Sequence, residues 1–217
     1  MFKNSRTDLA IEKDILDNSY ELIVFNDLLD KVKIKKEIMK KIKHFIKIKN
    51  NKHIFIVGLG NENNTADSIG PNVIKKINVN SHLNDFGVKT KNKISALEPG
   101  VLGTTGINTK KIVESITKEI KPDLVIVIDS YITKDFKYLN KSIQITNKGI
   151  TPGSGFSSKD DEISYNTLHI PVLVIGVATA IEIKKYSKNY IVSTKDIDKY
   201  VIDISNIISD ALNTIFG

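Results

Sequence analysis

Short apolar runs alternate with amphipathic stretches along the chain. Runs rich in Ile, Val and Leu predict strands, whereas apolar residues that recur every three or four positions predict helices. The strands are predicted at residues 20–25, 54–57, 93–97, 123–130, 142–146 and 171–177. The helices are predicted at residues 31–52, 71–77, 109–119 and 196–216. This alternation predicts an α/β fold, a three-layer sandwich whose mostly parallel sheet is covered by helices on both faces.

The strand at 142–146 differs from the others because apolar and polar residues alternate in it, which predicts a half-exposed strand. No internal repeat or long linker divides the chain, so a single α/β domain is expected. Ligands of such sheets bind beyond the carboxyl ends of the strands. We therefore expect the functional site in the loops that follow strands 54–57 and 123–130.

The segment 31–52 combines an apolar stripe with many lysines and supplies much of the net charge of +7. We interpret it as a solvated amphipathic helix that packs on the sheet. No aromatic interleaving supports base stacking, and Arg6 is the only arginine, so direct nucleic-acid binding is not expected. The residues predicted to share the apolar face are Val32, Ile34, Ile38, Ile42, Phe45 and Ile46.

Composition and motifs exclude several classes of protein. Without cysteine there is no disulfide framework, zinc–thiolate site or thiol nucleophile. No apolar run approaches the ~20 residues that span a bilayer, and the N-terminus has no apolar signal segment, so we expect a cytoplasmic protein without membrane contact. The glycine loop at 58–63 fits neither a dinucleotide nor a Walker pattern, and Ser154 lacks the first glycine of a nucleophile elbow.

Carboxylates remain as the candidate chemistry. Asp67 precedes a Gly-Pro helix start, and Asp129 is expected to end the apolar run VIVID. If the two meet in one crevice, like-charge coupling lets one stay protonated while the other is ionised, as acid–base activation of water requires. The alternatives are ordinary: Asp67 as a turn or N-cap residue, and Asp129 as a cap of a neighbouring backbone N–H.

Glycine-rich loops at the same predicted edge of the sheet indicate a binding cleft, because glycine lets a backbone approach a substrate closely and offers free N–H groups. Single glycines among them are equally compatible with tight turns. The residues predicted to bind substrate are Gly60, Asn61, Gly103, Thr104, Thr105 and Ser154.

Several motifs in unbroken order closely resemble the germination protease of endospore-forming bacteria. They are IVGLGNENNTADSIGP, EPGVLGTTG, KPDLVIVIDS, SIQITNKGITPGSG and IPVLVIGV. The resemblance implies a fold related to hydrogenase maturation proteases and an atypical aspartic endopeptidase, with Asp67 and Asp129 as the catalytic pair. It also implies small acid-soluble spore proteins as substrates, a spore location, a homotetramer, and no cofactor or metal.

The N-terminal motif RTDLAIE resembles the self-processing site of that family. The resemblance implies cleavage between Asp8 and Leu9, with residues 1–8 as a propeptide and residues 9–217 as a single peptidase domain. The alternative interpretation is a helix start in which Ser5 and Asp8 form a capping box.

The chain also departs from the family pattern, because it is shorter and carries Glu98 where a small apolar residue is expected. For the peptidase, we expect the backbone N–H groups of Thr104 and Thr105 to act as oxyanion donors. Two alternatives to the peptidase stay open. One is a catalytically silent relative that binds spore proteins or a partner. The other is a metallopeptidase with Asp67, Asp129 and either Glu98 or His169 as ligands.

Overall fold

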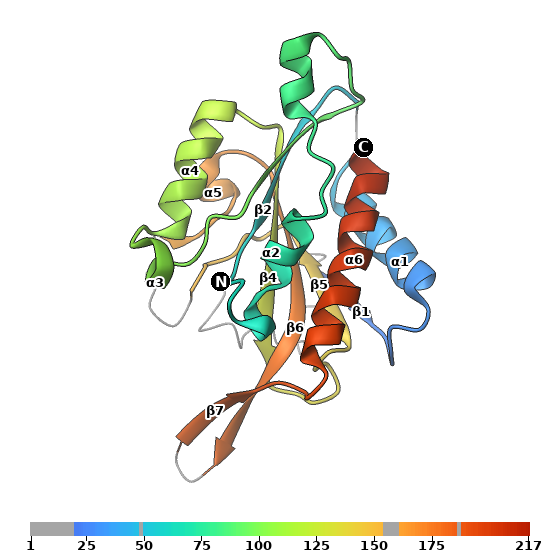
Figure 1. Ribbon diagram of the computed structural model, residues 1–217, viewed down its shortest axis with the longest axis vertical. Helices are drawn as coiled ribbons and strands as arrows, with labels where there is room; N and C mark the ends of the chain where they lie inside the picture. Colours follow the sequence, from blue (N-terminus) through green and yellow to red (C-terminus); the bar gives the residue numbers. More distant parts are fainter. Residues whose placement is uncertain (1–19, 48–49, 154–160, 186–187) are drawn as a thin grey trace.

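The computed structural model describes residues 20–47, 50–153, 161–185 and 188–217. Their strands form one seven-stranded sheet in the order β1-β5-β6-β4-β2-β3, with β7 paired to β6. Strands β6, β4, β2 and β3 run parallel, whereas β1, β5 and β7 each pair antiparallel with their neighbours. Figure 1 shows helices on either side of this sheet. The predicted three-layer α/β sandwich with a mostly parallel sheet is therefore confirmed.

The elements occur in a β/α alternation along most of the chain. The strands are β1 (Tyr20–Val24), β2 (His53–Gly58), β3 (Lys93–Leu97), β4 (Leu124–Thr133), β5 (Ser142–Thr146), β6 (Val172–Lys185) and β7 (Lys188–Val192). The α-helices are α1 (Lys31–Phe45), α2 (Ile69–Ile74), α3 (Leu102–Thr105), α4 (Thr109–Ile120), α5 (Tyr165–Leu168) and α6 (Ile197–Phe216), and the 3₁₀ turns are η1 (Thr65–Asp67) and η2 (Ser81–Phe86).

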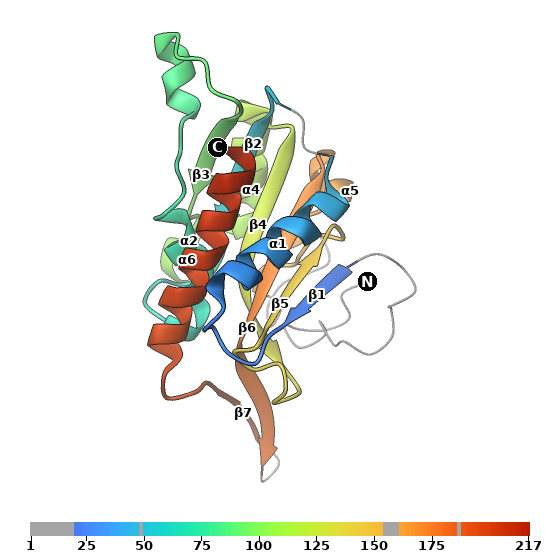
Figure 2. The ribbon, with the colours of Figure 1, turned by 90° about the vertical axis from the view of Figure 1, so that its right-hand side faces the viewer.

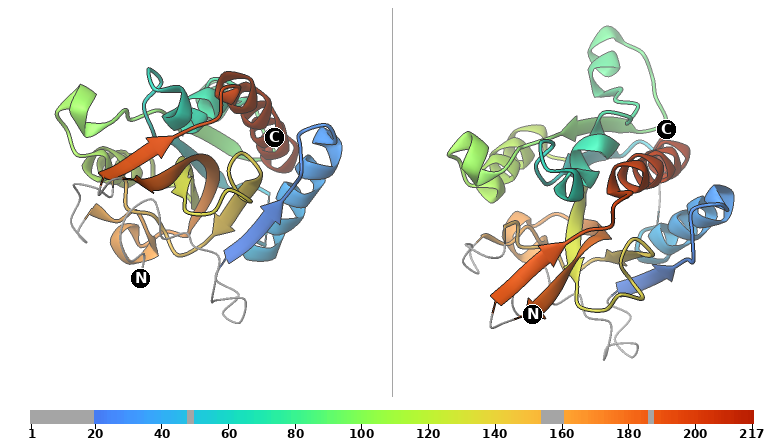
Figure 3. Two further views of the ribbon diagram at one scale, coloured as in Figure 1. Left: turned by 90° about the horizontal axis from the view of Figure 1, so that it is seen from below. Right: turned by 60° about the horizontal axis from the view of Figure 1, so that its bottom comes forward.

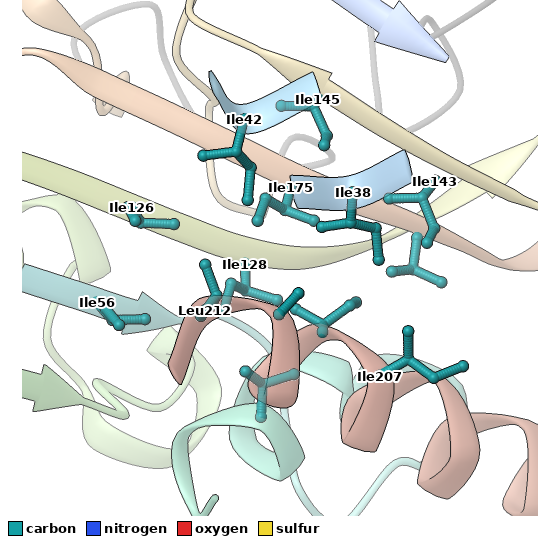
Figure 4. Close-up of a cluster of buried hydrophobic side chains, with 14 of the residues drawn as sticks. Ile38, Ile42, Ile56, Ile126, Ile128, Ile143, Ile145, Ile175, Ile207 and Leu212 are labelled. Atoms are coloured by element: carbon teal, nitrogen blue, oxygen red, sulfur yellow. The ribbon is translucent and has the colours of Figure 1, made fainter. Parts of the chain in front are cut away.

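One face of the sheet packs against α1, α2 and α6, seen edge-on in Figure 2. Every fourth residue of α1 points into this layer, so Ile34, Ile38 and Ile42 are buried as the pattern predicted. They meet isoleucines of the sheet and the apolar stripe of α6 (Figure 4). This apolar cluster is the larger of the two described in the structure. It packs α6 along the sheet, and the helix runs in the direction opposite to the parallel strands.

The other face carries a smaller cluster under α4 and α5. Val113 of α4 and Leu168 of α5 cover Phe55, Val57 and the odd-numbered valines of β4. Successive side chains of a strand point to opposite faces, so each central strand contributes residues to both clusters. This is why the sequence of each central strand is an unbroken apolar run. Among the described residues, no helix is both long enough and apolar enough to cross a bilayer.

Three features of the amphipathic and alternating segments differ from the prediction. Helix α1 ends at Phe45 rather than near residue 52, because Ile46 turns to an extended conformation while still packing on the core. Val32 is 64% exposed, since it lies half a turn away from Ile34. Strand β5 is buried on both faces rather than half-exposed, because it lies inside the sheet between β1 and β6.

Strands β4 and β6 both extend further than their apolar runs predict. Strand β4 continues from Asp129 to Thr133, where it still pairs with Ile181 of β6. Beyond that pair β6 continues to Lys185 and pairs with β7 as an antiparallel hairpin, which the sequence pattern did not predict. This hairpin projects from the end of the sheet at which the parallel strands finish (Figures 1 and 2).

Candidate active site

Asp67 lies on the turn that connects β2 to α2. It is the last residue of η1 and is only 8% exposed. The N-cap position of α2 belongs to Ser68, so the alternative in which Asp67 caps this helix does not apply. The loop before it is fixed by backbone contact: a Cβ on Gly60, whose φ is +118°, would lie 1.9 Å from the Asp67 carbonyl oxygen. Only glycine fits there, and the Asp67 carboxyl group lies against it.

Helix α2 itself approaches β2 without intervening side chains. A Cβ on Gly58 would lie 2.4 Å from the Gly70 carbonyl oxygen, and a Cβ on Gly70 would lie 2.2 Å from the Leu59 carbonyl oxygen. Real Cβ atoms do not come this close to backbone, so both positions require glycine. The glycines of this loop thus bring the start of α2, and Asp67 with it, onto the carboxyl end of the sheet.

Asp129 lies inside β4 rather than at its end, which corrects the prediction. It faces Gly176 of β6 in the register of the sheet and is 3% exposed. The strand continues because β6 offers backbone partners past this point, and pairing of this kind does not depend on apolar side chains. The Ser130 N–H donates to the Asp129 carboxylate over 2.9 Å. Asp129 therefore accepts a hydrogen bond from a neighbouring backbone N–H, as the alternative interpretation of this residue predicts.

Backbone and side-chain hydrogen bonds bring the segments of the two aspartates to the same edge of the sheet. The Leu59 N–H donates to the Ile128 carbonyl oxygen over 2.8 Å, which joins the chain after β2 to β4 directly before Asp129. The Thr179 hydroxyl of β6 donates to the Ala66 carbonyl oxygen over 2.6 Å, directly before Asp67. The turn η1 is thus fastened to β6, and the loop that leads to it is joined to β4, the strand that carries Asp129.

The predicted binding residues divide into two groups. Asn61 belongs to the loop of Asp67, since its N–H donates to the Asp67 carbonyl oxygen over 3.1 Å. Gly103, Thr104 and Thr105 form the exposed short helix α3 instead of a loop. The N–H groups of both threonines donate to the Val101 carbonyl oxygen, at 2.9 and 3.0 Å. Both N–H groups are thus engaged by the N-cap residue of α3, and their role as oxyanion donors stays a prediction.

The remaining sequence-predicted residues have different outcomes. Ser154, Asp8 and Leu9 lie outside the described residues. His169 ends α5 just before β6 begins, at the edge of the sheet opposite to Asp129, so it does not join the two aspartates. In the described ranges no group of three or more His, Asp or Glu side chains is arranged to hold a metal ion.

Glu98 follows β3 and therefore lies at the same edge as Asp67, beside the end of β2. Burial raises the pKa of this carboxyl group, and repulsion from Glu62 raises it further, against the opposing attraction of Lys75. Lys75 forms an ion pair with Glu62, which raises the pKa of the lysine. This edge of the sheet is therefore rich in acidic groups, with one lysine among them.

Sequence reasoning missed Thr179 and the lysine–glutamate pair at this edge. Thr179 lies at the end of an apolar run that predicts only a buried strand. Its contact with η1 depends on the irregular register between β4 and β6 near Tyr131, for which the sequence carries no signal. The pairing of Lys75 with Glu62 likewise depends on how closely α2 folds back over its preceding loop.

The fold and this edge together define an α/β sandwich with two buried aspartates at the carboxyl end of its parallel sheet. A family model described as germination protease matches residues 19–186. That range covers most of the chain, so the chain belongs to the germination protease family.

Individual relatives agree with this assignment. The germination protease of Caldanaerobacter subterraneus subsp. tengcongensis is 40% identical over 146 residues, which cover 65% of this chain and 45% of the relative. Those of Clostridium tetani and Clostridium acetobutylicum are 36% and 38% identical, over 69% and 72% of this chain and 47% and 49% of the relatives. The chain thus spans about half the length of the curated relatives it matches.

A solved structure gives a looser likeness. The [NiFe] hydrogenase maturation protease HycI from Thermococcus kodakarensis matches with a TM-score of 0.44 and 17% identity. The match covers 74% of this chain and 92% of that protein.

Proposed function

We propose that this chain is an endopeptidase that cleaves small acid-soluble spore proteins during germination, with Asp67 and Asp129 as its catalytic pair. The observation that carries the proposal is the pair itself. In a member of the germination protease family, two buried aspartates are held at one edge of the sheet by the Leu59–Ile128 and Thr179–Ala66 hydrogen bonds.

In the proposed reaction, one aspartate is ionised and takes a proton from water, and the other is protonated and gives its proton to the leaving amine. The proposal requires the two carboxyl groups to lie close enough to share a proton, and two such carboxylates of low exposure do not both ionise readily. The Ser130 N–H donates to Asp129 and would stabilise its ionised form.

The proposal extends to the N-terminus and to assembly. Cleavage between Asp8 and Leu9 would release residues 1–8 and leave a peptidase domain of residues 9–217. The active protein would be a homotetramer in the developing spore. The mass of the purified chain tests the processing step, and light scattering of the same sample tests the assembly.

The engaged N–H groups of Thr104 and Thr105 favour a second candidate, a catalytically silent relative that binds spore proteins or a partner. Incubating the purified wild-type protein with a small acid-soluble spore protein separates the two candidates. The proposed function predicts cleavage fragments and loss of residues 1–8. Intact substrate bound to folded, unprocessed protein would overturn the proposal and support the silent relative. A chelator added to the same reaction tests the metal-dependent alternative, since it stops cleavage only there.

A further inference from the structure

The β6–β7 hairpin has a strand edge that the rest of the sheet does not cover. Strand β5 pairs with β6 only as far as Val177, and β4 only as far as Ile181. From Ile181 onward β6 pairs with β7 alone, and the hairpin extends past the sheet (Figures 1 and 3). Within residues 20–47, 50–153, 161–185 and 188–217, no strand pairs with the outer edge of β7.

The exposed strand is also apolar. Tyr190, Ile191 and Val192 are 46%, 64% and 38% exposed, and because they are consecutive they project from both faces of the hairpin. Alternate residues of an edge strand direct backbone N–H and C=O groups outward, and proteins normally cover or blunt an apolar edge of this kind. An extended polypeptide satisfies both requirements, because it supplies backbone partners and alternating side chains.

Hydrogen bonds connect this edge to the turn of Asp67. The Ser193 hydroxyl, directly after β7, donates to the Thr179 carbonyl oxygen over 2.9 Å. The Thr179 hydroxyl in turn donates to the Ala66 carbonyl oxygen over 2.6 Å. The C-terminal end of β7 is therefore linked, through Thr179 of β6, to the turn that carries Asp67.

Charge indicates which polypeptide suits the hairpin. Lys184 and Lys188 are both exposed near its tip, and they favour an acidic partner. The segment DLAIEKD at residues 8–14, which overlaps the motif RTDLAIE that resembles a family cleavage site, carries three acidic residues and one lysine and includes apolar leucine and isoleucine. Its composition is complementary to an edge that is apolar along its length and basic at its tip.

We propose that the outer edge of β7 is a substrate-docking strand, on which an acidic, extended segment of the substrate adds to the sheet and is led to Asp67 and Asp129. This inference rests on the proposed protease function. It makes Tyr190, Ile191 and Val192 residues that set affinity for the substrate rather than residues that take part in the chemistry.

The test uses a synthetic peptide of residues 3–14, KNSRTDLAIEKD, which has no net charge as a whole and carries the acidic segment DLAIEKD at its C-terminal end. The peptide is added to the full chain carrying Asp129→Asn, which slows cleavage. Amide hydrogen exchange of β7 is followed by NMR with and without the peptide. Peptide affinity is then compared between Ile191→Glu and the control Val24→Glu. Val24 is 53% exposed on β1, the strand at one end of the sheet order, so it is an exposed aliphatic residue of an edge strand, as Ile191 is.

Docking on β7 predicts that the peptide slows exchange of the outward β7 amides at least tenfold. It also predicts that Ile191→Glu weakens binding about tenfold or more while Val24→Glu leaves it unchanged. The docking strand would be overturned if the peptide leaves the β7 amides unprotected and Ile191→Glu cleaves the peptide as fast as Val24→Glu. Cleavage of the peptide by the wild type in that case would still support the proposed protease function. Protected amides without any cleavage by the wild type would support docking and count against the protease.

Discussion

Replacing Thr179 with valine tests whether one hydroxyl group holds Asp67 in position. Thr179 is 1% exposed and donates to the Ala66 carbonyl oxygen over 2.6 Å. Valine has nearly the same shape as threonine, so Thr179→Val removes a hydrogen-bond donor and changes the side-chain volume little. An acceptor left without its partner costs about 1–3 kcal/mol, and because Ala66 is only partly buried we expect about 1–2 kcal/mol.

The effect on activity should exceed the effect on stability. The lost hydrogen bond frees the turn that ends in Asp67, and a catalytic group misplaced by about 1 Å can lower a rate by about 10²-fold. Urea denaturation followed by circular dichroism measures the free energy of unfolding, and cleavage of the residue 3–14 peptide measures the rate. Both are read at a temperature at which the variant is fully folded.

Thr117→Val is the matched control. Thr117 is buried in α4 at 3% exposure, and its hydroxyl has no hydrogen-bond partner among the described residues. Removing that hydroxyl should leave stability unchanged or raise it slightly, because a buried polar group without a partner is unfavourable. If Thr179→Val and Thr117→Val have equal stability and equal cleavage rates, the hydroxyl does not hold the turn and the reasoning fails.

Three further predictions concern the loop, the acidic edge and the core. Gly60→Ala should destabilise the fold by more than about 3 kcal/mol in urea, because its Cβ overlaps the backbone of η1, whereas Gly103→Ala meets nothing within 4 Å and should be neutral. Folding raises the pKa of Glu98 above its ordinary 4.5, so its charge lowers stability as the pH rises past about 4.5. Glu98→Gln should therefore stabilise the protein at pH 7 and not at pH 4, and an equal gain at both would contradict the assignment. Ile42→Ala should cost about 2–5 kcal/mol and Val32→Ala less than about 0.5 kcal/mol, and similar losses would refute the account of α1.

The elements that sequence reasoning placed well are those whose side chains carry the pattern. Ile34, Ile38 and Ile42 recur at helical spacing and are buried, and the apolar runs of β2, β4 and β6 are central strands. Hydrophobic periodicity reports which face of an element meets the core, so it predicts such elements directly. The alternation of strands and helices was enough to predict the layers of the sandwich.

The features that sequence reasoning missed depend on backbone pairing or on distant contacts. Asp129 ends an apolar run, yet β4 continues past it because β6 supplies hydrogen-bond partners. Thr104 and Thr105 were expected in an open loop, but the chain closes a single helical turn there and uses their N–H groups. In both cases neighbouring backbone determines the conformation, and the side-chain pattern does not record it.

The candidate site itself was predictable in part. Asp67 and Asp129 were singled out because each follows an apolar run in a fold that binds ligands at the carboxyl ends of its strands. Their segments are indeed fastened to the same edge, by hydrogen bonds that involve Leu59 and Thr179. Those bonds join residues far apart in sequence, so the pattern permitted the meeting of the two segments without predicting it.

The catalytic pair is tested most directly by the kcat/KM for cleavage of the residue 3–14 peptide, with products identified by mass spectrometry. The control is Asp123→Asn, which alters an aspartate paired with Lys52 at the opposite edge of the sheet. The account predicts that Asp67→Asn and Asp129→Asn each lower kcat/KM by about 10²–10⁴-fold, while Asp123→Asn stays close to the wild type. Cleavage by both catalytic-pair variants at the wild-type rate would contradict it.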